Sequence, residues 1–333
     1  MSAPPSFKTA DTTVTKRQRL DHFLARWGYR RSEHRVEPGL YAVNAPGADA
    51  PVFVSANYTL SYDSLRSALA GIEGYILVLD TKGINVWCAA GKGTFGTDEL
   101  VLRIEESRLG EVVRHRSLVL PQLGAAGVSG HEVKELSGFD VHFGPVRAAD
   151  LRDYLAMGEA TPDMRLVRFD ARDRAVLIPI ELVGTLAPVL AGVAFLYIVD
   201  GALGASALLA AALAGTVLFP LLLPALPTSD FSSKGFLLGA AAVAPFALRL
   251  AWRQRREGPL SLRGALRQLQ YLLALPPVTA FIALNFTGAT TFASRSDVKR
   301  EMSLYIPLMA GLFGAGLLTL FARGIIILRE GKA

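Results

Sequence analysis

Cysteine is scarce in this chain, because its 333 residues contain only one, Cys88. A single cysteine excludes a disulfide within the chain, and no CxxC pair is present that could bind zinc or an iron–sulfur cluster. The five histidines are scattered without the spacing of a metal site. A P-loop and a Ser/His/Asp set are also missing, which argues against P-loop nucleotide binding and against hydrolase chemistry of that type.

The N-terminal segment Met1–Phe7 lacks the apolar core of a secretory signal peptide. We therefore expect the first half of the chain to stay in the cytoplasm, where a thiol remains reduced. The formal net charge is +6 and the pI is about 9.5. However, the arginines between 249 and 267 flank apolar segments, a pattern typical of membrane proteins. We expect no nucleic-acid binding.

Apolar residues are abundant and unevenly distributed. They make up 51% of the chain, and the mean hydropathy is +0.34. Most of the charge lies before residue 170, whereas long apolar runs occupy residues 175–328. The sequence therefore predicts three parts, which are an N-terminal extension (1–50), a soluble domain (51–172) and an all-α transmembrane domain (173–333).

Short apolar runs alternate with helical patterns in the soluble domain. Strands are predicted at 52–54, 75–79, 117–120, 139–143 and 166–169. Helices are predicted at 62–69, 97–109 (capped by Thr97), 131–136 and 148–157, with one more at 18–27 in the otherwise loop-rich extension. Strands that alternate with helices predict an α/β, Rossmann-like parallel sheet.

In such sheets a ligand lies beyond the carboxyl ends of the strands. Ser55 and Asn57 follow the first predicted strand, Gln122 follows the third, and Gly144 follows the fourth. The Cys88 segment comes directly after the second strand, so it is expected at the same edge.

Five apolar segments in the second half are each close to the roughly 20 residues that cross a bilayer. They lie at 177–199, 202–226, 235–251, 270–288 and 304–327. Five crossings from a cytoplasmic N-terminus would place the arginine-rich stretch 249–267 outside, against the positive-inside rule, whereas four would place it inside. We expect about five helices. Glu181 and Asp200 lie near segment ends, and no segment contains a cysteine or histidine.

The residues around Cys88 are small and glycine-rich. The segment from Asn85 to Thr97 reads NVWCAAGKGTFGT. Gly91, Gly93 and Gly96 leave the backbone open to close approach by a large flat group, since glycine has no Cβ. On spacing alone, Cys88 could equally be a buried cysteine that acts as a small hydrophobic residue.

This string resembles the cap-helix motif of the corrinoid proteins of the mercury-methylating pair (HgcA), which join a corrinoid domain to a membrane domain. The resemblance implies a corrinoid (cobalamin) cofactor with Cys88 as the lower axial ligand of cobalt and the catalytic group. The resemblance implies that the residues of the motif lie at the cofactor, which are Asn85, Val86, Trp87, Cys88, Ala89, Ala90, Gly91 and Lys92. The strand ends are expected to add Ser55, Asn57, Gln122 and Gly144. The large subunit of the corrinoid iron–sulfur protein of acetyl-CoA synthesis is a wider relative that lacks the membrane part and carries an iron–sulfur segment.

The resemblance also implies a function. The protein would be a corrinoid-dependent methyltransferase of the cytoplasmic (inner) membrane, multi-pass, that transfers a methyl group from Co(III)-methyl corrinoid to inorganic Hg(II), giving methylmercury. A thiolate is a soft, electron-rich cobalt ligand, suited to release of a carbanion equivalent. Reduction of the resulting Co(III) needs a partner, which in this family is a ferredoxin-like protein with two 4Fe–4S clusters (HgcB). The methyl donor would come from the folate/one-carbon pathway.

Several alternatives stay open at this point. Asn85 either caps the Cys88 helix or tunes the thiolate by a hydrogen bond. Trp87 is expected to pack against the domain, and Lys92 to cover the helix end or steady the thiolate. The chain could instead be a corrinoid methyl carrier of one-carbon metabolism, or a membrane transporter with a regulatory Rossmann-like domain.

Overall fold

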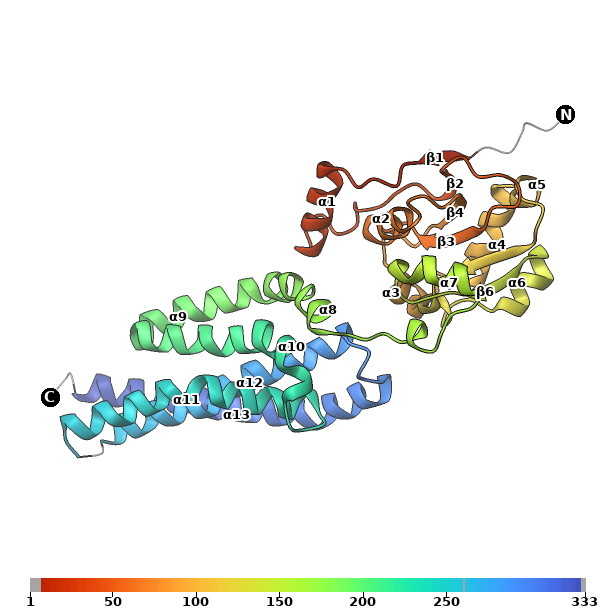
Figure 1. Cartoon of the computed structure of the whole chain (residues 1–333). Helices are drawn as coiled ribbons and strands as arrows, with labels where there is room; N and C mark the ends of the chain where they lie inside the picture. The colour runs from red at the N-terminus through yellow and green to blue at the C-terminus, as the bar shows by residue number, and fades with distance from the viewer. Residues whose placement is uncertain (1–6, 260, 331–333) are drawn as a thin grey trace. The chain divides into compact units, whose positions relative to one another are not determined.

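The computed structural model describes residues 7–259 and 261–330. The N-terminal residues examined for a signal peptide thus lie almost entirely outside the described part. The chain divides into two compact units, Met1–Arg168 and Phe169–Ala333, here called the sheet unit and the helical unit (Figure 1).

The sheet unit contains one six-stranded mixed sheet in the order β1-β2-β4-β3-β5-β6. Its strands are β1 (Lys8–Ala10), β2 (Gly39–Val43), β3 (Val52–Ala56), β4 (Gly74–Leu79), β5 (Ser117–Leu120) and β6 (Asp140–Phe143). Strands β3, β4, β5 and β6 run parallel, as predicted, while β2 is antiparallel to β4 and parallel to β1. The prediction of an α/β sheet with parallel strands is therefore confirmed.

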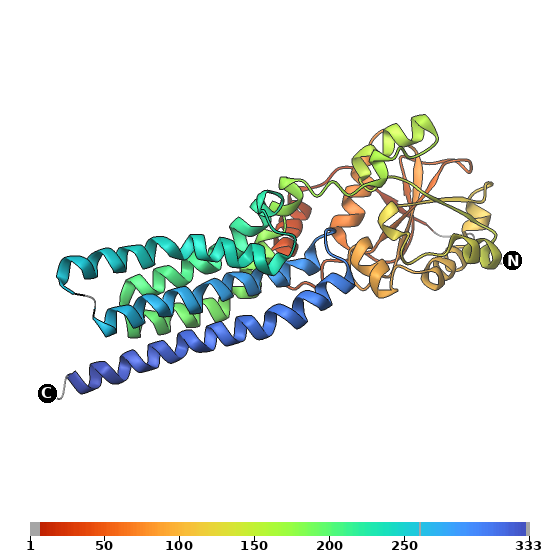
Figure 2. The same cartoon turned by 90° about the horizontal axis from the view of Figure 1, so that it is seen from below.

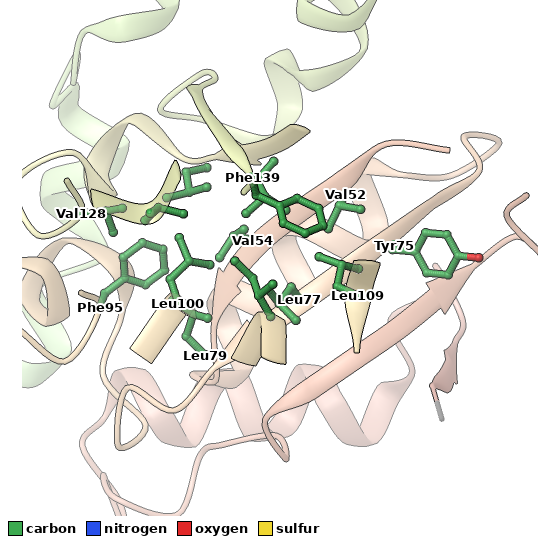
Figure 3. Close-up of a cluster of buried hydrophobic side chains, with 14 of the residues drawn as sticks. Val52, Val54, Tyr75, Leu77, Leu79, Phe95, Leu100, Leu109, Val128 and Phe139 are labelled. Carbon is green, nitrogen blue, oxygen red and sulfur yellow. The ribbon is translucent and has the colours of Figure 1, made fainter. Parts of the chain in front are cut away.

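The sheet is buried on both faces. Every residue of β4 is buried, which explains why its sequence GYILVL is apolar throughout. Alternation along the strands sends Leu77 and Val54 to one face and Ile76 and Phe53 to the other. Figure 3 shows the first face, where Leu77 and Val54 meet the side chains of the covering helices.

Helices on both faces complete the sheet unit. Side chains of α3, α4, α5 and α6 join the core on one face, and those of α2 and α7 join it on the other. The α-helices are α1 (Lys16–Arg26), α2 (Thr59–Ala68), α3 (Val86–Lys92), α4 (Thr97–Glu106), α5 (Leu109–Val112), α6 (Gly130–Ser137) and α7 (Leu151–Met157). Short 3-10 turns are η1 (Gln122–Gly124), η2 (Ala148–Asp150) and η3 (Asp163–Arg165).

The structure corrects three sequence predictions. Gly39–Val43, which we expected in a loop of the extension, is the buried strand β2. Residues 166–169 form no strand, because Phe169 has a left-handed backbone (φ 46°) that strands do not adopt. Thr97 does not cap α4. The cap position is Gly96, and the Thr97 hydroxyl instead accepts a hydrogen bond from the backbone N–H of Ser129 at 2.9 Å.

The helical unit is composed of helices, of which α9, α11, α12 and α13 are long and apolar (Figure 2). The α-helices are α8 (Ala171–Ala175), α9 (Ile178–Leu213), α10 (Phe219–Leu222), α11 (Phe231–Glu257), α12 (Leu262–Asn285) and α13 (Arg295–Glu330). The π-turn η4 (Ala214–Leu218) and the 3-10 turns η5 (Leu223–Ala225) and η6 (Phe286–Ala289) connect them. Four of its helical stretches are long and apolar enough to cross a membrane, at 171–225, 231–256, 262–289 and 295–330.

The first of these stretches contains two of the five predicted segments. It is 55 residues long and is broken at Gly201, whose backbone (φ 72°, ψ −169°) is open essentially to glycine alone. Figure 1 shows α9 turning back on itself into two antiparallel arms. The five apolar segments predicted from sequence therefore lie in four helical stretches.

An ionic cluster closes the turn between the arms of α9. The Asp200 side chain is only 2% exposed and forms ion pairs with Arg323 of α13 (2.5 Å) and Arg267 of α12 (2.9 Å). The hydroxyl of Tyr271 donates a hydrogen bond to the same carboxylate. Asp200, expected only as a residue between segments, thus connects three helices.

Glu301 of α13 caps the first turn of α11. Its buried carboxylate accepts hydrogen bonds from the backbone N–H of Phe231 (3.0 Å) and from the N–H and hydroxyl of Ser232 (both 2.9 Å). The start of α11 is therefore satisfied by a side chain from a helix about 70 residues later in the chain.

Candidate functional site

The winding of the parallel sheet reverses between β3 and β5. From β3 the chain crosses to β4 on one side, and then returns past β3 to β5 and β6 on the other. In open α/β sheets the crevice at such a reversal, beyond the carboxyl ends of the strands, is where ligands bind. The loops that follow β3, β4 and β5 meet at this edge.

Helix α3 brings Cys88 to this edge. Asn85 caps it by accepting a hydrogen bond from the backbone N–H of Cys88 at 2.9 Å, as predicted. Val86, Ala89 and Ala90 are buried against the sheet. Because α3 makes two turns, its other face carries Trp87, Cys88, Gly91 and Lys92 toward solvent.

Cys88 is a free cysteine that is partly exposed. This position disfavours its interpretation as a buried small hydrophobic residue. Trp87 is 37% exposed, so the domain covers most but not all of its side chain. Lys92 lies one turn beyond Cys88, at the i+4 position on the same helix face.

The loop between β5 and α6 packs closely on the α3 segment through two glycines. A Cβ on Gly127 would lie 2.2 Å from the Phe95 carbonyl oxygen and 2.9 Å from the Ala90 Cα. A Cβ on Gly124 would lie 2.5 Å from the Phe95 ring. Both glycines are therefore required for this approach. Sequence reasoning missed them, although the GxxG spacing directly after a predicted strand was a visible signal.

A buried amide holds the turn that leads into α3. Asn57 is 1% exposed, and its side-chain oxygen accepts hydrogen bonds from the backbone N–H of Thr81 (3.1 Å) and of Gly83 (2.9 Å) and from the Thr81 hydroxyl (2.9 Å). Its amide nitrogen donates to the carboxylate of Asp80 at 3.0 Å. Asn57 therefore fixes the β4–α3 turn.

Asp80 is the charged member of this turn. Partial burial acts to raise the pKa of Asp80, but hydrogen bonds from Lys82, the charge of Lys82 and the Asn57 amide outweigh it and lower the pKa below its usual range. The backbone N–H of Asp80 also donates to Glu99 of α4 at 2.6 Å.

The predicted site residues fall into two groups. One group is exposed or partly exposed at the edge formed by the carboxyl ends of β3, β4 and β5, here called the ligand edge. Its members are Asn85, Trp87, Cys88, Gly91, Lys92 and Gln122. Those buried beneath the edge are Ser55, Asn57, Val86, Ala89, Ala90 and Gly144. The Ser55 hydroxyl donates within its own strand, to the Ala56 carbonyl at 3.3 Å. The carbonyl oxygen of the Gln122 side chain accepts a hydrogen bond from Arg165 at 3.1 Å.

Comparisons with known proteins match the sheet unit. A family model described as "CO dehydrogenase/acetyl-CoA synthase delta subunit" matches residues 28–155. The acetyl-CoA decarbonylase/synthase complex subunit gamma of Archaeoglobus fulgidus is 39% identical over 127 residues, which are 38% of this chain and 27% of that protein. The corresponding subunit of Methanopyrus kandleri is 36% identical over 127 residues, with the same coverage.

The corrinoid/iron-sulfur protein large subunit of Moorella thermoacetica is 26% identical over 153 residues, 43% of this chain and 34% of that protein. The sheet unit is a relative of this large subunit. The chain thus spans about a quarter to a third of the length of these relatives. The family match includes Cys88 and the surrounding loops and ends before the helical unit begins.

Proposed function

We propose that this protein is a membrane-bound, corrinoid-dependent methyltransferase that uses Cys88 as the lower axial ligand of cobalt and inorganic Hg(II) as its methyl acceptor. The observation that carries the proposal is the position of Cys88. It is a free, partly exposed thiol on the ligand edge of a parallel sheet, within a region similar to corrinoid/iron-sulfur protein subunits.

The residues present fit a corrinoid. Among the described residues no three His, Cys, Asp or Glu side chains come together to hold a metal ion. A single thiolate is nevertheless a suitable donor set when the metal arrives with its own macrocycle, because cobalt then needs only an axial ligand. No atom outside its own helix backbone lies within 4 Å of the position that a side chain on Gly91 would take. The helix face beside Cys88 is therefore open to a flat group.

The residues of the site have separable roles in this proposal. Asn85 and the buried Ala89 and Ala90 hold α3 in place, so that the Cys88 sulfur has a defined position. Lys92 lies on the same helix face, one turn beyond Cys88, and is exposed beside it. The corrinoid, once bound, supplies a cobalt that carries and releases a methyl group, while the protein sets the axial ligand and the access of the acceptor.

The acceptor Hg(II) and the partners are inferred from the resemblance of NVWCAAGKGTFGT to the mercury-methylating corrinoid proteins (HgcA). On that basis the electron donor is a ferredoxin-like protein with two 4Fe–4S clusters (HgcB), and the methyl donor belongs to the folate/one-carbon pathway. The names of the relatives favour a second candidate function, a corrinoid methyl carrier of one-carbon metabolism.

We propose that the helical unit is an anchor that holds the sheet unit on the cytoplasmic face of the inner membrane. A groove of about 590 Å³ lies among α9, α12 and α13, and its described lining residues are mostly apolar and include no cysteine or histidine. The groove offers no soft ligand to pass Hg(II) along, which disfavours the transporter alternative.

The test uses the full chain in nanodiscs, reconstituted with cobalamin, the ferredoxin-like partner, a methyl donor and Hg(II). We expect isotope-labelled methylmercury by mass spectrometry and a visible spectrum typical of a thiolate-ligated corrinoid. In Cys88→Ala both should be lost while the fold is retained, because the side chain is small and partly exposed. The control variant Leu136→Ala, at an exposed residue of α6, should behave as the wild type.

Full methylmercury formation by Cys88→Ala would contradict the proposal. A wild-type protein with the thiolate-dependent spectrum that methylates a one-carbon acceptor but not Hg(II) would support the carrier function instead. If the visible spectrum of Cys88→Ala equals that of the wild type, Cys88 is not the axial ligand of cobalt.

A further inference from the structure

Helix α1 is amphipathic, but its polar face contacts the sheet unit and its apolar face is exposed. Its inner face attaches to the sheet unit by polar contacts. His22 is hydrogen-bonded to Asp63 of α2 at 2.7 Å, and Asp21 contacts His34 at 2.7 Å and the Thr59 hydroxyl at 2.9 Å. The polar side chains of α1 therefore hold it on the domain.

The outer face of α1 is apolar. Leu20, Phe23 and Trp27 are 57%, 55% and 38% exposed. Their spacing of three and four residues places them on one side of the helix. The rings of Phe23 and Trp27 are 5.9 Å apart, and Tyr29, 53% exposed, follows directly. Single exposed apolar residues are ordinary, but a contiguous aromatic and aliphatic patch indicates an interaction surface.

Basic residues surround this patch. Residues 16–35 contain seven Lys and Arg residues and only two acidic residues, Asp21 and Glu33. All seven cations have exposed side chains, and they are Lys16, Arg17, Arg19, Arg26, Arg30, Arg31 and Arg35. On the helix, Arg19 and Arg26 border the patch on one side and Arg17 on the other.

We infer that the outer face of α1 docks on an anionic membrane surface. Trp, Phe and Leu on one face, flanked by Lys and Arg, are the composition of helices that lie in the bilayer interface. The cations match the negative charge of anionic headgroups, which attract Lys and Arg near the membrane surface. The same chain has apolar helices that begin only a few residues after the sheet unit, so a bilayer is within its reach.

The surface can be tested with a single fluorophore, because Cys88 is the only cysteine. In a Cys88→Ala background, Leu20→Cys is labelled with an environment-sensitive dye, and Leu136→Cys, at a leucine 62% exposed on α6, is the matched control. The full chain is placed in nanodiscs that contain lipids with brominated acyl chains, which quench a dye only at the bilayer. The nanodiscs are either zwitterionic or partly phosphatidylglycerol.

We expect at least a twofold greater quenching at Leu20→Cys than at Leu136→Cys in anionic nanodiscs. The excess should fall at high salt and when Arg17, Arg19 and Arg26 are all changed to Glu. Equal quenching at the two positions would overturn the inference. An excess that is the same in zwitterionic and anionic nanodiscs would show that anionic headgroups do not contribute to docking and would also overturn the inference. A dye shift seen only when a ferredoxin-like protein is added, without bromine quenching, would assign the face to that protein instead.

Discussion

The two units of this chain distribute apolar side chains in opposite ways. In the sheet unit all five residues of β3 are buried. In the helical unit some of the largest apolar side chains are the most exposed, with Ile198 at 84% and Leu318 and Phe321 at 70% each. Among the described residues of the helical unit, Asp200, Glu301 and Arg323 are buried instead. The difference is compatible with a lipid environment for the helical unit, since in lipid apolar surface faces outward and polar groups need internal partners.

The units also use their buried polar groups differently. In the sheet unit, Asn57 holds one turn of the backbone beside Cys88. In the helical unit, Asp200 holds separate helices together through full charges. Substitutions should therefore damage the two units by different amounts and with different local consequences.

The largest effect is expected from Asp200→Asn. Two arginines, one of them buried, would lose their counter-charge, and we expect the free energy of unfolding to fall by about 3–5 kcal/mol. Thermal unfolding of the detergent-solubilised chain measures this. The control is Asp297→Asn, at the exposed start of α13, where, among the described residues, the carboxylate accepts hydrogen bonds only from Ser294 and the loss should be much smaller. An unfolding temperature equal to that of the wild type would show that the cluster does not hold the helices together.

Asn57→Ala should have the next largest effect. It leaves two backbone N–H groups in a buried turn without their acceptor, at a cost of about 2–3 kcal/mol. We also expect faster alkylation of Cys88, because α3 is less restrained. Asn44→Gly removes two hydrogen bonds elsewhere in the sheet unit, to the carbonyls of Leu69 and Ile72, and should leave Cys88 alkylation unchanged. Similar alkylation rates in both variants would contradict a specific role of Asn57.

Gly91→Ala distinguishes folding from cofactor binding. Alanine is favoured over glycine in a helix by up to about 1 kcal/mol, and the site has room for its methyl group, so the free protein should be as stable or slightly more stable. Cobalamin, measured by its absorbance after gel filtration, should bind more weakly because the methyl group projects from the open face. Gly47→Ala, at another uncrowded glycine, should bind as the wild type does. Undiminished binding by Gly91→Ala would place the corrin elsewhere.

The smallest effect is expected on acidification. Because the pKa of Asp80 is lowered in the folded protein, its ionised form stabilises the turn above the pKa of the unfolded chain. This contribution is lost as the pH falls below about 4 toward the folded-state pKa. Hydrogen exchange of the Thr81 and Gly83 amides is read by mass spectrometry and divided by the intrinsic exchange rate at each pH, and their protection should fall in this range. In Asp80→Asn the protection should no longer depend on pH here, and a profile equal to that of the wild type would rule out Asp80 as the cause.

Most of the sheet could be predicted from sequence because its strands are short apolar runs separated by helical patterns. Tyr75–Leu79 is apolar throughout and was predicted within one residue of β4. Gly39–Val43 was missed because it is a short run inside a polar, basic stretch, and only its pairing with β4 explains its burial. Leu166–Phe169 is a short, mostly apolar run that resembles a strand, but the ring of Phe169 packs edge-on against Phe292 in the helical unit, 5.4 Å away.

In the candidate site, the local contact at the start of α3 could be predicted from sequence, whereas the burial of the residues beneath α3 could not. The prediction that Asn85 caps the Cys88 helix is confirmed, because a capping residue acts over three positions of sequence. Asn57 and Ser55 were predicted at the cofactor because they follow a strand, and the structure places both beneath the surface. Burial of a strand-end residue depends on the loops above it, here the turn before α3, and no local pattern reports that.

The cap that Glu301 provides for α11 has a consequence for how the protein is made. Phe231 and Ser232 leave the ribosome about 70 residues before the carboxylate that binds their N–H groups. During synthesis the first turn of α11 therefore lacks its acceptor until α13 has been made and has packed against it. A chain truncated before Glu301 would keep this helix start without its cap, so it would differ from the complete chain at α11 as well as at its end.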